Sequence, residues 1–153
     1  MALYLVQHGK SLPKETDPEQ GLSERGRTDV ARIADVAGQY GVRPAGIYHS
    51  GKKRARQTAE MFAGALKPPR GCDAMEGLKP LDDVVGFSQR IDEAQDTMLV
   101  GHLPFMQALT AYLITGKTDI TVFKFQNGGI VCLDKDPGQT GWYIKWALMP
   151  NID

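Results

Sequence analysis

Cysteine and histidine are scarce in this 153-residue sequence, which has two cysteines and three histidines. Cys72 and Cys132 stand far apart, with no CxxC pair and no Cys/His spacing typical of zinc sites. The histidines are equally scattered, and no HExxH motif occurs. We therefore expect two reduced, buried thiols, no metal and no other cofactor.

An excess of charge of either sign is also missing, because 18 Lys and Arg residues balance 18 Asp and Glu residues. This balance gives no general attraction to nucleic acid or to anionic lipid, so any anion site has to be local. No apolar stretch approaches the ~18 to 20 residues that span a bilayer, and no basic region precedes an apolar core at the N-terminus. We expect a single cytoplasmic domain over residues 1–153 that binds neither nucleic acid nor membrane.

Short apolar runs alternate with longer helical patterns, and Gly or Pro separates them. We expect strands at 3–6, 46–49, 97–100, 120–125, 129–133 and 142–147, and helices at 23–41, 55–66, 81–94 and 104–116. Ser23 is predicted to cap the first helix and Ser50 the second, and the NGG segment at 127–129 suggests a hairpin turn. The alternation predicts an α/β fold, as a three-layer α/β/α sandwich with a mainly parallel sheet.

Three of the predicted strands end in residues suited to binding an anion. The QHG segment at 7–9 follows the first strand, Ser50 to Arg54 follows the second, and Gly101 and His102 follow the third. Ligands of such sheets bind beyond the carboxyl ends of the strands. Two imidazoles, a guanidinium and a helix N-terminus meeting there predict a site that phosphate or sulfate can occupy.

These segments resemble the motifs of the histidine phosphatase superfamily, which has the phosphoglycerate mutase-like fold. LVQHGKS at 5–11 stands in the place of the family's RHG motif, and HSGKKRARQTAE at 49–60 is similar to its SPxxRAxQT segment. LVGHLP at 99–104 resembles the motif of the second histidine. The short length, LSERG at 22–26 and the lack of a large insertion resemble the SixA branch, phosphohistidine phosphatases that act on phosphorylated signalling proteins.

The resemblance implies roles for individual residues. His8 corresponds to the nucleophile that accepts the phosphoryl group, and Arg54 and His102 correspond to residues that bind its oxygens. Gly9 would let the backbone approach the phosphate closely. For attack, His8 needs one nitrogen unprotonated and the other bonded to an acceptor, which we expect to be a backbone carbonyl.

Gln7 stands where the family has its first arginine, and glutamine keeps a donor but loses the charge and the two-pronged grip. We still assign it to the phosphate site and expect weaker binding. Lys10, Lys52 and Lys53 are expected to be solvated rather than to replace the missing charge. Glu76 is the first candidate for the general acid, ahead of the carboxylates at positions 82 and 83.

The function that we expect is hydrolysis of phosphohistidine on a protein partner through a covalent intermediate on His8. One alternative is a weakly active or inactive phosphate-binding module, which the glutamine at position 7 favours. A second is a small-molecule phosphomonoesterase, which would need a specificity lid that the sequence does not show. His49 is expected to be structural, since alternation along its strand should turn its side chain away from the site.

Overall fold

Six strands form one sheet in the order β3-β2-β4-β1-β5-β6. The computed structural model describes residues 1–152, and its strands are β1 (Leu3–Gln7), β2 (Gly46–His49), β3 (Cys72–Ala74), β4 (Thr97–Gly101), β5 (Ile130–Asp134) and β6 (Tyr143–Leu148). The first four strands are mutually parallel, whereas β5 runs antiparallel to β1 and β6 antiparallel to β5. The predicted α/β fold with a mainly parallel sheet is confirmed.

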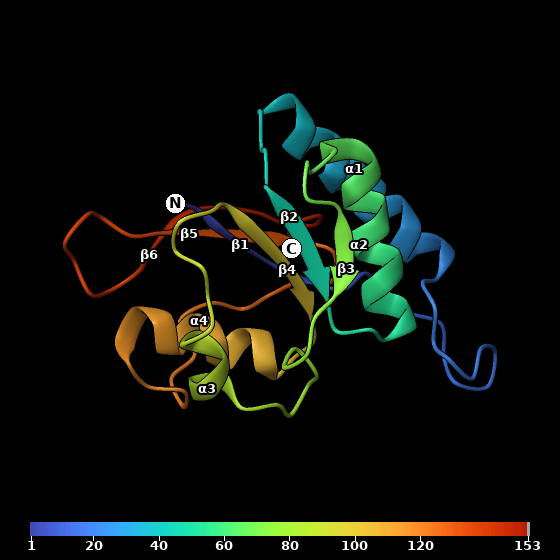
Figure 1. Cartoon of the computed structure of the whole chain (residues 1–153). Helices are drawn as coiled ribbons and strands as arrows, with labels where there is room; N and C mark the ends of the chain where they lie inside the picture. The colour runs from blue at the N-terminus through green and yellow to red at the C-terminus, as the bar shows by residue number, and fades with distance from the viewer. Residues whose placement is uncertain (153) are drawn as a thin grey trace.

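The described residues form four helices, two on each face of this sheet (Figure 1). They are α1 (Glu24–Gln39) and α2 (Lys53–Leu66) on one face and α3 (Val84–Ser88) and α4 (Phe105–Thr115) on the other. Within residues 1–152, no helix has the length and apolar character needed to cross a membrane.

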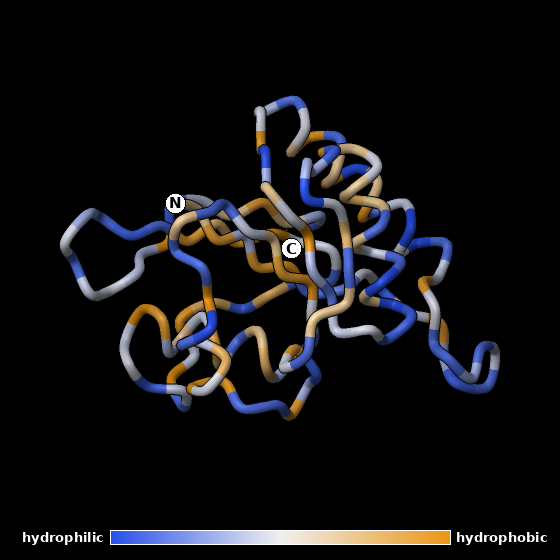
Figure 2. The backbone as a smooth tube through the Cα atoms, in the orientation of Figure 1, coloured by the Kyte–Doolittle hydropathy of each residue, from blue (hydrophilic) through white to orange (hydrophobic). Residues whose placement is uncertain are grey.

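The apolar run of β1 is explained by its burial on both faces. Tyr4 and Val6 pack in the core beneath α1 and α2, and Leu3 and Leu5 pack in the core beneath α3 and α4. Successive side chains of a strand point to opposite faces, so a central strand covered on both sides needs apolar residues throughout. In the hydropathy view, the strands at the centre of the sheet are mainly in the orange, hydrophobic colours (Figure 2).

Helix boundaries follow the signals expected from the sequence. The Ser23 hydroxyl accepts the Gly26 N–H at 3.0 Å and caps α1, and Gly41 follows this helix with a φ of +80°. Helix α4 ends at Gly116, whose φ of +79° is the left-handed conformation that glycine adopts without strain. These predicted boundaries are confirmed.

Two expected elements are wrong. The helix expected at 81–94 shrinks to the five residues of α3, because the Asp82 carboxylate accepts the Lys79 N–H and holds the preceding segment in a turn. The strand expected at 120–125 is an irregular segment that joins none of the six strands of the sheet. The rings of Phe123 and Phe125 instead pack edge to face against each other in the core beside α4, with their centroids 5.3 Å apart. The short strand β3 was not expected.

The NGG segment forms a turn, but it does not join two strands of a hairpin. Gly129 donates to the Gln126 carbonyl, and Gly128, with a φ of +83°, donates to the carbonyl of Gln7 at 2.8 Å. The turn therefore leads into β5 and supports the end of β1. The antiparallel pair at this end of the sheet is β5 with β6.

Candidate phosphate site at the sheet edge

The two motif histidines meet because β1 and β4 are adjacent and parallel. Gln7 pairs with Gly101 at the ends of these strands, and the His8 N–H donates to the Gly101 carbonyl at 3.0 Å. The imidazole rings of His8 and His102 then lie with their centroids 4.9 Å apart. His102 is almost completely buried, whereas His8 is half-buried. The expected convergence of the two rings is thus present.

Arg54 reaches the same place from the neighbouring strand β2, in the first turn of α2. Its charge lies close enough to lower the pKa of both His8 and His102. Three cations, at positions 52 to 54, open this helix, and its first turn holds no acidic residue. Cations at the positive end of a helix dipole are unfavourable, and a bound anion relieves that cost. The helix start has the electrostatics of an anion site.

The tautomer of His8 follows from a single hydrogen bond. Its Nδ1 lies 2.7 Å from the carbonyl oxygen of Gly9, which can only accept, so Nδ1 carries the proton and Nε2 the lone pair. Burial lowers the pKa of His8 to about 4; the bond to Gly9 opposes this shift, and the charge of Arg54 adds to it. The imidazole is therefore neutral near pH 7, with Nε2 free to react.

Three polar side chains with no role assigned from the sequence bond to the backbone of the first motif or of the loop that leads into α1. Thr58 accepts the Gly9 N–H at 2.9 Å and donates to the Arg54 carbonyl at 2.8 Å, which links the first motif to the second. Gln57 accepts the backbone N–H of residue 22 at 2.7 Å. Asn127 donates to the His8 carbonyl at 3.0 Å. Gln57 and Thr58 stand in the RARQT segment at 54–58, so the motif itself could have identified them as candidate supporting residues.

Close packing also explains why residue 9 is a glycine. A Cβ at this position would lie 2.7 Å from Cγ2 of Val30 and 3.0 Å from Cδ2 of Leu22. Any side chain here would push α1 away from the end of β1. The expected close approach of this backbone to phosphate stays a prediction.

Ser50 does not cap α2, contrary to expectation. The residue at the cap position is Lys52, and the Ser50 hydroxyl instead lies 2.6 Å from Nε2 of His102. Burial is the largest cause that lowers the pKa of His102 to about 3, and the neighbouring His8 and the positive charges of Arg54 and Lys52 contribute to the same shift. His102 is thus a neutral, buried ring whose Nε2 is occupied by a serine hydroxyl. His49 is also buried, and its Nδ1 accepts the N–H of Gly51 at 3.1 Å.

Within residues 1–152, two buried side-chain polar atoms have no hydrogen-bond partner, and both belong to predicted site residues: Oε1 of Gln7 and Nδ1 of His102. A buried polar atom without a partner costs about 1 to 3 kcal/mol. Rotating the Gln7 amide by 180° exchanges its oxygen and NH2 group, so this position can offer a donor. Both atoms are suited to completing their hydrogen bonds on a ligand.

The candidate general acid, Glu76, is exposed and lines a surface cavity of about 460 Å³ together with Ser50, Lys52 and Lys79. Because the Ser50 hydroxyl bonds to His102, one side chain connects this cavity to the two imidazoles. Asp82 accepts the Lys79 N–H and lines a different cavity. Of the acidic candidates, Glu76 is thus the one that shares a cavity with a side chain touching His102.

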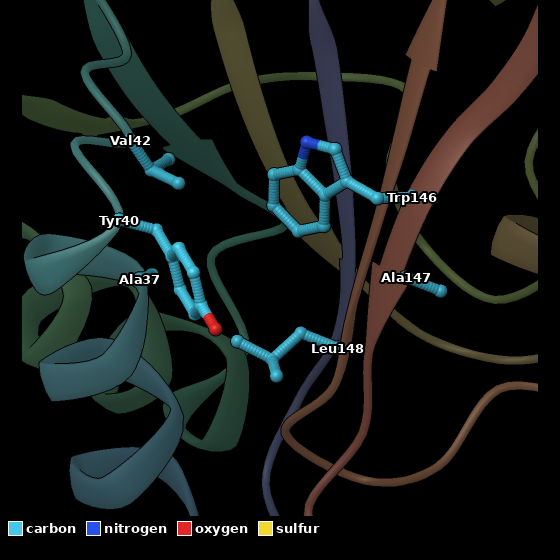
Figure 3. Close-up of a pocket in the computed structure, with 6 residues that line it drawn as sticks. All are labelled: Ala37, Tyr40, Val42, Trp146, Ala147 and Leu148. Carbon is cyan, nitrogen blue, oxygen red and sulfur yellow. The ribbon is translucent and has the colours of Figure 1, made fainter.

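A cavity of about 440 Å³ between the C-terminal end of α1 and β6 holds none of the predicted site residues. Tyr40 and Leu148 point toward each other across it, and Trp146 lies on the strand side (Figure 3). Its lining carries no charged side chain, so it does not resemble an anion site. In the part of the chain that the structure describes, no three His, Cys, Asp or Glu side chains lie together as metal ligands would.

Comparison with known proteins decides the family. Residues 3–82, from β1 through the loop after β3, match the model of the histidine phosphatase superfamily (branch 1). The chain belongs to this superfamily. Both the QHG segment and Arg54 lie within the matched range. An uncharacterized protein from Picosynechococcus sp. is 32% identical over 126 residues, which are 77% of this chain and 76% of the relative.

Solved structures agree with the superfamily fold. The protein histidine phosphatase SixA, complexed with tungstate, superposes with a TM-score of 0.84 at 23% identity over 98% of this chain and 97% of its own. A candidate phosphohistidine phosphatase SixA from Agrobacterium tumefaciens superposes at 0.77 with 27% identity over 97% of both chains. A candidate alpha-ribazole-5′-P phosphatase from Escherichia coli also gives 0.77, at 16% identity over 100% of this chain and 99% of its own. The phosphoglycerate mutase-like fold is thus shared by proteins with different substrates.

Proposed function

We propose that this superfamily member hydrolyses phosphohistidine on a protein partner through a phosphoryl group held covalently on His8. One observation carries the proposal: the hydrogen bond from Nδ1 of His8 to Gly9, which leaves Nε2 with its lone pair beside His102 and under the charge of Arg54. In-line phosphoryl transfer requires such a fixed, neutral nucleophile and positive charge around the equatorial oxygens.

The reaction has two steps. In the first, the lone pair of His8 Nε2 forms a bond to phosphorus while the bond from phosphorus to the substrate's imidazole nitrogen breaks, and the departing nitrogen keeps the bonding electrons and takes up a proton from solvent. In the second, water attacks phosphorus, the bond to Nε2 breaks, and inorganic phosphate leaves. Arg54 supplies charge to the phosphoryl oxygens in both steps, and Nδ1 of His102 donates to them when the Ser50 hydroxyl donates to Nε2.

Two observations support a protein substrate. The cavity beside the site is rimmed by exposed residues, so a protein surface can reach it. The similar SixA structures concern protein histidine phosphatases, and one holds tungstate, a tetrahedral oxyanion. Imidazole also leaves phosphorus more readily than an alkoxide, so Glu76 has little acid catalysis to supply.

The glutamine at position 7 favours a second candidate function, a module that binds phosphorylated partners and turns them over slowly. Its amide is buried at the end of β1 and carries no charge. Both functions use the same site, and they differ in whether His8 becomes phosphorylated.

The test is to incubate the protein with a phosphohistidine-bearing domain and, separately, with p-nitrophenyl phosphate, with His8→Ala as the matched control. We expect release of phosphate from the domain and, on rapid quenching, a phosphoenzyme whose bond is labile to acid and stable to alkali. Turnover no faster than that of His8→Ala, with binding retained, would establish the binding module instead.

A further inference from the structure

The cavity beside His102 has an unusual charge pattern. Its lining consists of Ser50, Gly51, Lys52, Ala74, Met75, Glu76 and Lys79. Ser50 is buried and bonded to His102, whereas the lysines and Glu76 are exposed at the rim. Two exposed ammonium groups and one exposed carboxylate therefore stand at the rim of a cavity whose lining residue Ser50 is bonded to His102.

Neither lysine has an acidic partner among the described residues. Lys53, by contrast, pairs with Asp17 at 3.0 Å and with Glu19 at 3.8 Å, so its charge is already neutralised. The carboxylate of Glu76 lines the same cavity but makes no ion pair with Lys52 or Lys79 within residues 1–152. Lys52 is exposed, as expected from the sequence, and its charge contributes to lowering the pKa of His102.

The position of these charges indicates what they bind. Lys52 stands at the start of α2, two residues before Arg54, and Lys79 comes from the loop after β3. A volume of about 460 Å³ falls in the ~300 to 1,000 Å³ range of small-ligand sites, which leaves room for side chains beside the phosphorylated one. The open rim fits an extended polypeptide or a helix surface.

Resting on the proposed function, we propose that this cavity is a subsite for carboxylate side chains that flank the phosphorylated histidine of the partner. Lys52 and Lys79 bind these carboxylates, while the phosphoryl group itself is bound by Arg54 and His102. The subsite makes the protein selective for phosphohistidines in acidic surroundings and supplies positive charge outside the position that Gln7 occupies.

The experiment measures binding rather than turnover. Two fluorescent peptides carry a stable phosphoryl-triazole in place of phosphohistidine, flanked either by aspartates or by asparagines, and their Kd values are compared by anisotropy at low ionic strength. The variants are Lys79→Glu in the cavity and, as a matched control, Lys117→Glu, an exposed lysine beyond the C-terminal end of α4.

We expect the unmodified protein to bind the aspartate peptide about 2- to 5-fold more tightly for each lysine engaged, with a preference that shrinks as salt is added. Lys79→Glu should abolish or reverse the preference, and Lys117→Glu should preserve it. Equal affinity for both peptides, no binding of either, or equal effects of the two variants would overturn the subsite. A preference that persists in a protein without phosphatase turnover would reject the proposed function and leave the subsite standing.

Discussion

Gln7→Arg is the substitution that tests most directly how the site binds a phosphoryl group. Gln7 lies at the end of β1, directly before His8; the residue is 9% exposed, and its Oε1 has no partner within the described chain. An arginine there would add a charged, two-pronged donor beside Arg54. We expect this arginine to lower the activation free energy by the value of the hydrogen bonds that it makes to the phosphoryl oxygens in the transition state.

A hydrogen bond to a charged group contributes about 1.5 to 3 kcal/mol. If the gain is realised in the transition state, kcat/KM should rise roughly 10- to 150-fold. The inhibition constant for inorganic phosphate should fall by up to a similar factor, because the free anion meets the same guanidinium. Without an anion, the new buried charge should make the variant less stable, so phosphate should raise its Tm more than it raises that of the original protein.

Gln7→Met is the matched control, since it keeps the length of the side chain and removes the amide. It eliminates a buried acceptor without a partner, so the free energy of unfolding should rise by up to about 1 to 3 kcal/mol in urea denaturation. If the amide donates to the phosphoryl group, the same variant should lose roughly 2- to 10-fold in kcat/KM, the value of a neutral hydrogen bond. Unchanged kinetics and phosphate affinity in both variants would refute the placement of position 7 against the phosphoryl group.

The remaining predictions address the two imidazoles and the side chains that bond to them or to their backbone. In an NMR titration, His8 should remain in the neutral Nδ1–H tautomer down to about pH 5 and titrate near pH 4, and a midpoint near 6.5 would contradict its burial. The histidines of the unfolded chain titrate near pH 6.5, whereas His8 and His102 in the folded chain have pKa values of about 4 and about 3. The unfolded state therefore takes up protons first, and the free energy of unfolding should fall as the pH drops from about 6.5 toward 4. Ser50→Ala should lower kcat about 5- to 150-fold, the effect of leaving His102 without its remaining partner, and Ser50→Thr, which keeps the hydroxyl, should restore most of the rate. Asn127→Ala should reduce kcat and lower the free energy of unfolding by about 1 kcal/mol through loss of the bond to the His8 carbonyl, and an unchanged kcat would show that this bond does not position the nucleophile.

The sequence was sufficient to predict which segments meet at the site. Apolar runs ending in QHG and GH predicted buried strands of one mainly parallel sheet, and the carboxyl ends of parallel strands share one edge. What it did not contain was the partner of each polar atom. Ser50 precedes a helix, as a capping residue does, and only the packing of β2 against β4 shows that its hydroxyl reaches His102 instead.

The C-terminal third was harder to predict for a physical reason. Phe123 and Phe125 alternate as the residues of a strand do, but their rings pack against each other in the core beside α4, and the segment joins no strand of the sheet. The NGG segment has the glycines that a tight turn needs, and it does turn, but its donors bond to the end of β1. Local sequence predicts the conformation of such a segment better than it predicts the part of the chain to which the segment bonds.

The glutamine at position 7 and the lysines of the cavity both affect how much positive charge surrounds a bound phosphoryl group. Burial and nearby cations keep both imidazoles neutral, so Arg54 is the one full positive charge that the site residues themselves supply to a doubly charged phosphoryl group. An arginine at position 7 would balance the second charge at the phosphorus itself, whereas Lys52 balances it from the rim. Charge at the rim interacts with the partner as much as with the phosphoryl group. With the proposed subsite, the glutamine at position 7 makes binding depend less on the phosphoryl group and more on the residues around it. Gln7→Arg should therefore narrow the difference between the aspartate and asparagine peptides as it raises the affinity for both.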